Sequence, residues 1–200
     1  MKKGIAFFDF DGTITTKDTL LEFIRFAKGT LPFYTGFMLN SPYLVAFKAK
    51  IISNQLAKEK ILAYFFKGMP LAHFEEICQR FATEVLPGLL RPDALKEIRS
   101  LQEKNIEIVI VSASPENWLK QWAQSIGASL IATRLEVKND RLTGKIEGLN
   151  CYGEEKVCRI KALYTLTDYL DIFAYGDSSG DKPMLALANH SSYKPFRKIN

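Results

Sequence analysis

Short apolar runs alternate with amphipathic segments along the chain beyond residue 90. The run at 106–111 is largely β-branched, which is typical of a strand buried on both faces of a sheet. The segment 92–104 begins with a proline and places its apolar residues on one face, which predicts a helix. The same reasoning predicts helices at 115–127, 154–166 and 181–188, strands at 5–8, 130–131, 169–175 and 191–193, and a hairpin with strands at 135–137 and 142–146. Strands that alternate with helices predict an α/β fold with a mostly parallel sheet, whose ligands lie beyond the carboxyl ends of the strands.

The segment from about residue 14 to 89 lacks this alternation and has a helical pattern throughout. Residues 23–74 hold seven basic residues, one acid and 11 of the 24 aromatic residues of the chain, so their composition differs from that of the remainder. We therefore predict an α/β core formed by residues 1–13 and 90–200, with a helical cap inserted at 14–89.

An uncharged stretch at 31–47 stands out within the predicted cap. As a helix it would span about 25 Å, which is short of the ~30 Å hydrocarbon core, and Pro32, Gly36 and Pro42 interrupt it, so we expect no membrane span. Two interpretations stay open. Either the aromatic residues pack the core of the cap and the lysines are solvated, or the segment rests on an anionic membrane or covers a lipid substrate.

Composition narrows the class of protein. With 200 residues, 47% hydrophobic content and 24% charged content, the chain resembles an ordinary globular protein, and Met1-Lys2-Lys3 is followed by too few apolar residues for a signal peptide. Three cysteines without metal-like spacing indicate a reducing compartment, and we expect the cytoplasm. The net charge of +5 comes without a regular basic helix or a base-stacking module, so we expect no nucleic-acid partner.

Carboxylates follow the first predicted strand, in the run Asp9-Phe10-Asp11-Gly12-Thr13. Because a strand alternates its side chains, we expect Asp9 and Asp11 to point the same way and to repel each other unless a cation neutralises them. Carboxylate oxygens suit Mg²⁺, and Gly12 allows the backbone to turn close to a ligand. A turn with two solvated aspartates is the alternative.

Three other places at the ends of predicted strands carry candidate chemistry. Asp177 and Asp181 follow the strand 169–175 and would add two acids, although a turn with a helix N-cap would also explain them. Ser112 ends the central strand beside a helix start, where an anion could bind, while Ser114 fits a simple capping role. Lys156 lies in a first helical turn, where its charge opposes the helix dipole, so it is either paired with an anion or solvated at the surface.

In order, these residues resemble the four motifs of the haloacid dehalogenase superfamily, and the position of the helical insert resembles its subfamily IB, the phosphoserine-phosphatase-like branch. The resemblance implies a Rossmann-like core and a Mg²⁺-dependent phosphatase. It implies that Asp9 is the nucleophile, that Asp11 is the acid and base, and that Asp9, the Asp11 carbonyl and Asp177 hold Mg²⁺. It also implies supporting positions for Asp181 and Ser178, and a phosphate site made by Ser112, Ala113, Lys156, Gly12 and Thr13.

The substrate stays open among small phosphorylated compounds. Asp18 stands where the resemblance to phosphoserine phosphatases implies an acid for the substrate amino group, but Ala113 and Ser178-Ser179-Gly180 depart from that pattern. A lipid-phosphate phosphatase at a membrane surface is a second alternative, and a non-catalytic phospho-ligand binder on the same fold is a third. The sequence sets no oligomeric state.

Overall fold

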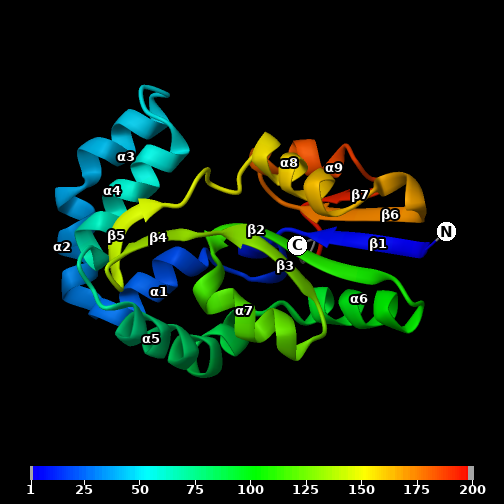
Figure 1. The fold of residues 1–200 in the computed structure, drawn as a ribbon, viewed down its shortest axis with the longest axis horizontal. Coiled ribbons are helices and arrows are strands. Elements are labelled where there is room, and N and C mark those ends of the chain that lie inside the picture. The colour runs from blue at the N-terminus through cyan, green and yellow to red at the C-terminus, as the bar shows by residue number, and fades with distance from the viewer. Residues whose placement is uncertain (1, 198–200) are drawn as a thin grey trace.

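The computed structural model describes residues 2–197 of the chain. Its main sheet has the strand order β3-β2-β1-β6-β7, and every neighbouring pair is parallel. These strands are β1 (Lys2–Phe8), β2 (Glu107–Pro115), β3 (Ser129–Thr133), β6 (Tyr169–Gly176) and β7 (His190–Tyr193). Strands β4 (Leu135–Lys138) and β5 (Arg141–Ile146) form an antiparallel hairpin. The predicted α/β fold with a parallel sheet and a hairpin is confirmed (Figure 1).

The central strand β1 separates two apolar layers. Ile5 and Phe7 pack into one layer, Ala6 and Phe8 pack into the other, and all four are fully buried. Helices α6 (Pro92–Glu103) and α7 (Glu116–Ser125) cover the Phe8 side, and α8 (Glu154–Leu163) and α9 (Lys182–Leu185) cover the other side (Figure 1). Burial of each large apolar side chain stabilises the fold by roughly 1.5–3 kcal/mol. The buried strand β1 therefore fixes the position of Asp9, which follows it directly in the chain.

The insert between β1 and α6 is helical, as predicted. It consists of α1 (Thr19–Lys28), α2 (Thr30–Leu39), α3 (Ser41–Lys48), α4 (Asn54–Phe66) and α5 (Leu71–Glu84). Phe23 of α1 stacks on Trp118 of α7 with ring centroids 4.3 Å apart, and it contacts Phe66, Phe74 and Phe81. One apolar cluster therefore runs from the insert into the α/β core.

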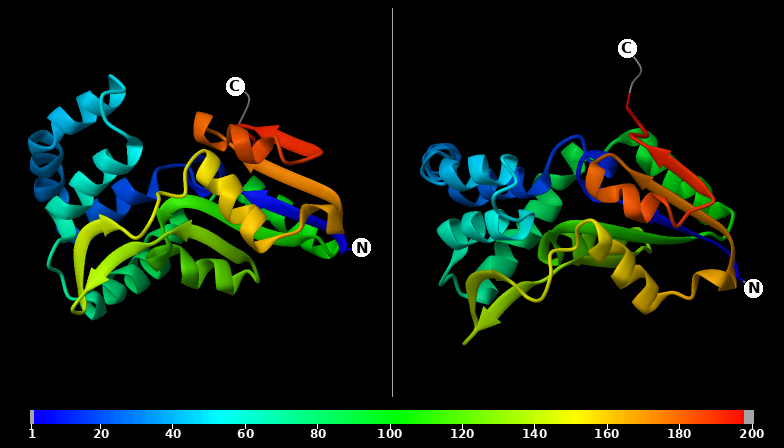
Figure 2. Two further views of the ribbon diagram at one scale, coloured as in Figure 1. Left: turned by 45° about the horizontal axis from the view of Figure 1, so that its top comes forward. Right: turned by 90° about the horizontal axis from the view of Figure 1, so that it is seen from above.

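The hairpin lies against the insert, not beside the main sheet (Figures 1 and 2). Gly144 of β5 approaches α4 so closely that a Cβ atom there would overlap the backbone and side chain of Ala63. The Gly68 amide also donates to the Leu142 carbonyl at 2.7 Å, which joins the end of α4 to the same strand. The hairpin is thus packed against α4 and connected to the segment that follows it.

Two details of the sequence prediction are wrong. Strand β1 ends at Phe8, and residues 10–14 form a tight turn of π-helix type in which Gly12 has φ of 82°. Asp9 and Asp11 therefore do not alternate on one strand. The helix predicted at 181–188 is shorter, because a 3-10 turn at Ser179–Asp181 precedes α9. Among the described residues, no helix is long and apolar enough to cross a membrane.

Candidate active site

Asp9 lies at the carboxyl end of β1, and its amide donates to the Tyr175 carbonyl at 2.9 Å. Asp9 is only 6% exposed, and one of its carboxylate oxygens accepts from Thr13 Oγ1 at 3.0 Å. Its other oxygen lies 2.6 Å from Lys156 Nζ. Burial raises the pKa of Asp9 to about 7, although the charge of Lys156 acts in the opposite direction.

Lys156 lies in the first turn of α8 and is 1% exposed, which excludes the interpretation as a surface lysine. Its Nζ donates to Asp9 Oδ1 at 2.6 Å, to Asp181 Oδ1 at 2.7 Å and to the Val111 carbonyl at 2.8 Å. Burial alone would lower the pKa of Lys156, but Asp9 and Asp181 raise it above its ordinary value. The lysine is therefore charged, and it joins the ends of β1 and β2 to the segment that follows β6.

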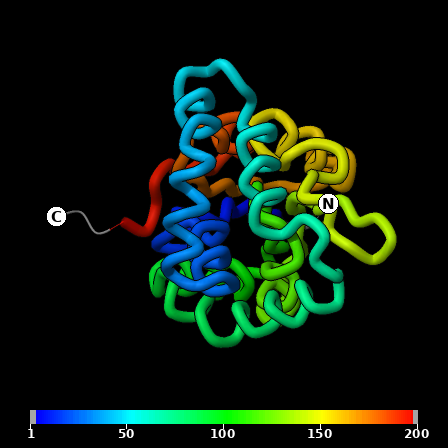
Figure 3. Tube along the Cα trace, turned by 90° about the vertical axis from the view of Figure 1, so that its left-hand side faces the viewer, coloured from blue at the N-terminus to red at the C-terminus, as the bar shows by residue number. Residues whose placement is uncertain are grey.

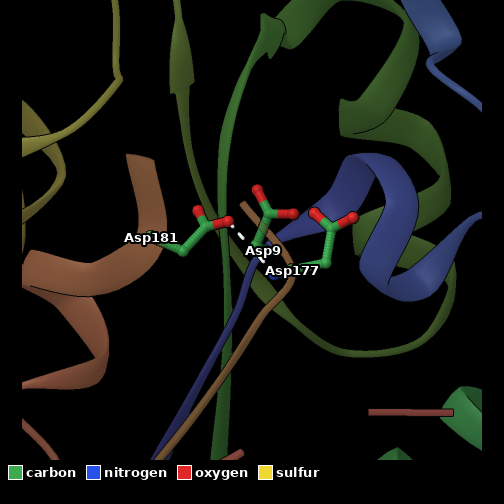
Figure 4. Close-up of side chains that lie close together, drawn as sticks. All are labelled: Asp9, Asp177 and Asp181. Atoms are coloured by element: carbon green, nitrogen blue, oxygen red, sulfur yellow. Dashed lines mark hydrogen bonds between the residues drawn. The ribbon is translucent and has the colours of Figure 1, made fainter. Parts of the chain in front are cut away.

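Asp177 and Asp181 both lie beside Asp9, as Figure 4 shows. Asp181 Oδ2 accepts from the Ser178 hydroxyl at 2.7 Å and from the Ser178 amide at 2.9 Å. Burial would raise the pKa of Asp181, but Lys156 and these donors lower it below its ordinary value. Burial and the charge of Asp181 raise the pKa of Asp177, although its carboxylate is paired with Arg197.

These three carboxylates fit a magnesium ion. Asp9, Asp177 and Asp181 each offer one oxygen, and the three oxygens lie within 4.8 Å of one another. Hard oxygen ligands of this kind are those that Mg²⁺ prefers. Lys156 is shared by Asp9 and Asp181, and Arg197 pairs with Asp177, so one negative charge of the three acids stays unbalanced and a divalent cation would neutralise it. Gly12 borders this space, because a Cβ atom at Gly12 would overlap the carboxylate of Asp177.

Asp11 is oriented differently from the prediction. Its Oδ1 accepts from both the amide and the hydroxyl of Thr19 at 2.6 Å, and its Oδ2 accepts from Ser114 Oγ at 2.7 Å. The turn at Gly12 directs this carboxylate towards the start of α1 and the end of β2, away from the group of three acids. The Asp11 side chain lines the same cavity as Asp9 and Asp181 but is not one of the three carboxylates whose oxygens lie together, and a contribution from its backbone carbonyl stays a prediction.

Ser112 is fully buried below this position. Its hydroxyl lies 3.4 Å from Asp11 Oδ2 and accepts from the Ser114 amide at 3.0 Å. Ser114, for which the sequence suggested only capping, contacts both Asp11 and Thr19. Trp118 Nε1 donates to Thr19 Oγ1 at 3.2 Å. Sequence reasoning missed the role of Thr19, because a hydroxyl inside a helical insert carries no pattern of its own, and it gave Ser114 a capping role only.

A cavity of about 220 Å³ lies above these groups, between the core and the insert. Lys58 of α4 reaches into it and donates to the Ala113 carbonyl at 2.9 Å and to Asn150 Oδ1 at 3.3 Å. Burial lowers the pKa of Lys58, and Asp11 and Asp18 act in the opposite direction. Asp18 caps α1 by accepting from the Leu21 amide, and it lines the same cavity. Lys58 was visible in the sequence only as one member of a basic segment.

The chain is similar to one protein family and to several known proteins. Residues 6–186 match the family of haloacid dehalogenase-like hydrolases. Protein CicA of Caulobacter vibrioides (strain NA1000 / CB15N) is 38% identical over 194 residues, which cover 95% of this chain and 85% of that protein. The probable phosphatase Rv3661 of Mycobacterium tuberculosis (strain ATCC 25618 / H37Rv) is 28% identical over 193 residues, which cover 94% of this chain and 67% of that protein.

Two solved structures illustrate the shared fold. A protein with unknown function from Bordetella pertussis Tohama I aligns with a TM-score of 0.82 at 22% identity, covering 96% of this chain and 89% of that chain. A substrate-bound phosphoserine phosphatase aligns with a TM-score of 0.64 at 22% identity, covering 96% of this chain and 86% of that chain. At this identity the likeness shows a common fold.

Proposed function

The chain belongs to the family of haloacid dehalogenase-like hydrolases, and from this premise we propose that it hydrolyses a phosphate monoester with Mg²⁺, through an aspartyl-phosphate on Asp9. The observation that carries the proposal is the buried Asp9 carboxylate, bonded to Lys156 and within 4.8 Å of oxygens of Asp177 and Asp181. Such a carboxylate is fixed in position, and Lys156 offsets its repulsion from an incoming phosphate dianion.

The first step forms a bond between a carboxylate oxygen of Asp9 and phosphorus and breaks the bond from phosphorus to the ester oxygen. The leaving oxygen takes a proton from Asp11, which enters this step in the acid form. Thr19 and Ser114 hold the Asp11 carboxyl by three bonds of 2.6–2.7 Å, so its orientation is set before substrate arrives. In the second step Asp11 accepts a proton from water, the water oxygen bonds to phosphorus, and phosphate leaves with Asp9 restored.

Mg²⁺ would be held by Asp9, Asp177 and the Asp11 carbonyl. Asp181 would support this set, because it is hydrogen-bonded to Lys156 and to Ser178. When bound, the ion supplies Lewis-acid stabilisation of the phosphoryl oxygens, which contributes several kcal/mol. Lys156 would bind a phosphoryl oxygen, together with the backbone around Gly12, Thr13 and Ala113. Ser112 would hold Asp11 and the Ser114 amide in position, because its hydroxyl contacts both groups.

Activity towards an aryl phosphate tests this proposal directly. Wild type should turn over with Mg²⁺ and stop in EDTA, and Asp9→Asn should abolish multiple turnover without unfolding the protein. Asp140→Asn is the matched control, because Asp140 is exposed in the hairpin turn at φ of 57°, a conformation that asparagine tolerates. Multiple turnover by the Asp9→Asn protein would exclude Asp9 as the nucleophile, and full activity in EDTA would exclude the magnesium site.

Phosphoserine deserves a place in the substrate panel because the cavity holds a carboxylate and an ammonium group from the insert, Asp18 and Lys58. A zwitterionic substrate would pair with both charges. A panel of phosphorylated metabolites and lipids would separate this substrate from lipid phosphates. Saturable binding without turnover of any compound would favour a phospho-ligand binder.

The free cysteines, of which Cys78 and Cys151 are buried, support our placement of the protein in a reducing compartment such as the cytoplasm.

A further inference from the structure

Large apolar side chains are exposed along α2, α3 and the loop that follows them. We call this set the cap-tip face, and its members are Leu31, Tyr34, Met38, Leu39, Tyr43, Val45 and Ile51. Leu31 is 74% exposed, Met38 67%, Val45 65% and Ile51 76%. Figure 3 shows α2 and α3 as a nearly continuous column in front of the remainder of the molecule.

The exposed residues are not needed to pack the insert. In α2 the inward side is already apolar, because Phe33 and Phe37 contact each other, Phe37 contacts Phe65, and Gly36 lies tightly against Phe65. Leu31, Tyr34 and Met38 follow the spacing i, i+3, i+7 and occupy the opposite side. A helix that is apolar on all sides is normally covered on all sides. In the uncharged stretch at 31–47, the inward residues therefore pack the insert and the outward residues face solvent.

The charges around the face are positive. Between residues 23 and 74 the chain has seven basic residues and only one acid, and none of these charges lies between 31 and 47. Lys48 and Lys50 lie between Val45 and Ile51 of the face and are exposed, and Lys60 lies over the ring of Tyr43 at 5.2 Å. A second copy of the chain would bring two basic surfaces together. An anionic surface with an apolar interior complements both the charge and the exposed side chains.

We propose that the cap-tip face docks on an anionic membrane surface, with Leu31, Met38, Val45 and Ile51 entering the boundary between headgroups and acyl chains while Lys48 and Lys50 contact lipid phosphates. Shallow insertion of aliphatic side chains beside lysines is the usual mode of interfacial helices. A tyrosine such as Tyr34 suits the headgroup level, where its ring and hydroxyl meet different surroundings. The docking requires no hydrolysis, so it is independent of the function proposed above.

Flotation with vesicles tests the proposal, with phosphatidylcholine vesicles compared with vesicles that also contain phosphatidylglycerol. The wild-type chain should float with the anionic vesicles, lose binding as salt is raised, and bind the zwitterionic vesicles at least about tenfold more weakly. The variant Leu31→Ser/Met38→Ser/Val45→Ser should reduce binding about tenfold or more, and Lys48→Gln/Lys50→Gln should remove most of the salt dependence.

The matched control is Leu149→Ser/Leu163→Ser/Leu170→Ser, which removes three leucines that are 59%, 67% and 56% exposed on the α/β core. This control should float as wild type does, and all variants should keep the wild-type thermal unfolding transition. Absence of wild-type binding to anionic vesicles would overturn the proposal, and so would an equal loss in the core control. A concentration-dependent dimer that Met38→Ser abolishes, without vesicle binding, would assign the face to a second copy and would also overturn it.

Discussion

Replacing Lys156 with methionine removes the only positive charge that the structure places among the buried carboxylates of Asp9 and Asp181. Methionine keeps the length of the side chain and the helix propensity, so the change is mainly electrostatic. With two carboxylate oxygens less than 4.8 Å apart, their repulsion amounts to at least about 3.5 kcal/mol at an effective dielectric constant near 20. Removing one partner of a buried ion pair typically costs about 3–5 kcal/mol, so both arguments agree.

Urea unfolding in EDTA measures this loss, and Lys161→Met is the control because Lys161 is exposed on the same helix. We expect Lys156→Met to lower the free energy of unfolding by about 3–5 kcal/mol and the control to change it by less than about 0.5 kcal/mol. Adding Mg²⁺ should restore part of the loss, because a divalent cation would neutralise the same carboxylates.

The pH dependence supplies an independent check. The pKa of folded Asp9 is raised from 3.8 to about 7, so the stabilisation gained by holding its proton is present below about pH 4 and is lost as pH rises through 7. Without Lys156 the charged form loses its partner and the pKa rises further. The deficit of Lys156→Met relative to wild type should therefore be larger near pH 8 than near pH 5.

A second variant distinguishes repulsion from simple loss of packing. Asp181→Asn combined with Lys156→Met should be more stable than Lys156→Met alone, because one of the two facing charges is gone. The reasoning would be refuted by a loss below about 1 kcal/mol, by a deficit that does not change with pH, or by additive effects of the two substitutions.

Two further predictions concern residues at the edge of the site. Arg197→Gln should raise the affinity for Mg²⁺ severalfold, because Arg197 pairs with the Asp177 carboxylate that the ion would use. Titration calorimetry measures this affinity, and Lys194→Gln is the control. An unchanged affinity of the Arg197→Gln protein would contradict the prediction. Gly144→Ala should lower the free energy of unfolding by about 1–3 kcal/mol more than Gly148→Ala does. Both glycines have positive φ, but only at Gly144 would the added Cβ atom overlap Ala63. Equal losses in urea unfolding would show that backbone strain alone accounts for the effect.

The location of the site could be predicted from the sequence because it depends on topology. In a parallel sheet the carboxyl ends of neighbouring strands meet, so aspartates after β1 and β6 had to lie close together, with Lys156 across from them. One local anomaly, a cation in a first helical turn, indicated that Lys156 could be paired with an anion, but the sequence alone left a solvated surface position open. These inferences needed only the period of the apolar pattern and the order of the elements.

The orientation of Asp11 could not be predicted in this way. It depends on a five-residue turn whose direction is set by Gly12, and strand periodicity gives the opposite answer. Contacts of the insert were also out of reach: Lys58 meets the Ala113 carbonyl across 55 residues, and Gly144 meets Ala63 through tertiary packing alone. The exposed side of α2 was hidden for another reason, since a pattern that is apolar on both sides of a helix does not say which side is buried.

The central position of β1 has a consequence for biosynthesis. Its two neighbours in the sheet, β2 and β6, begin about 100 residues or more downstream, at Glu107 and Tyr169. A ribosome therefore releases the strand that carries Asp9 long before its hydrogen-bonding partners emerge. Until residue 156 has been translated, the growing polypeptide lacks the cation that pairs with this carboxylate, and Asp181, which shares that cation, follows 25 residues later, so this buried charge cluster forms only after residue 181 has left the exit tunnel.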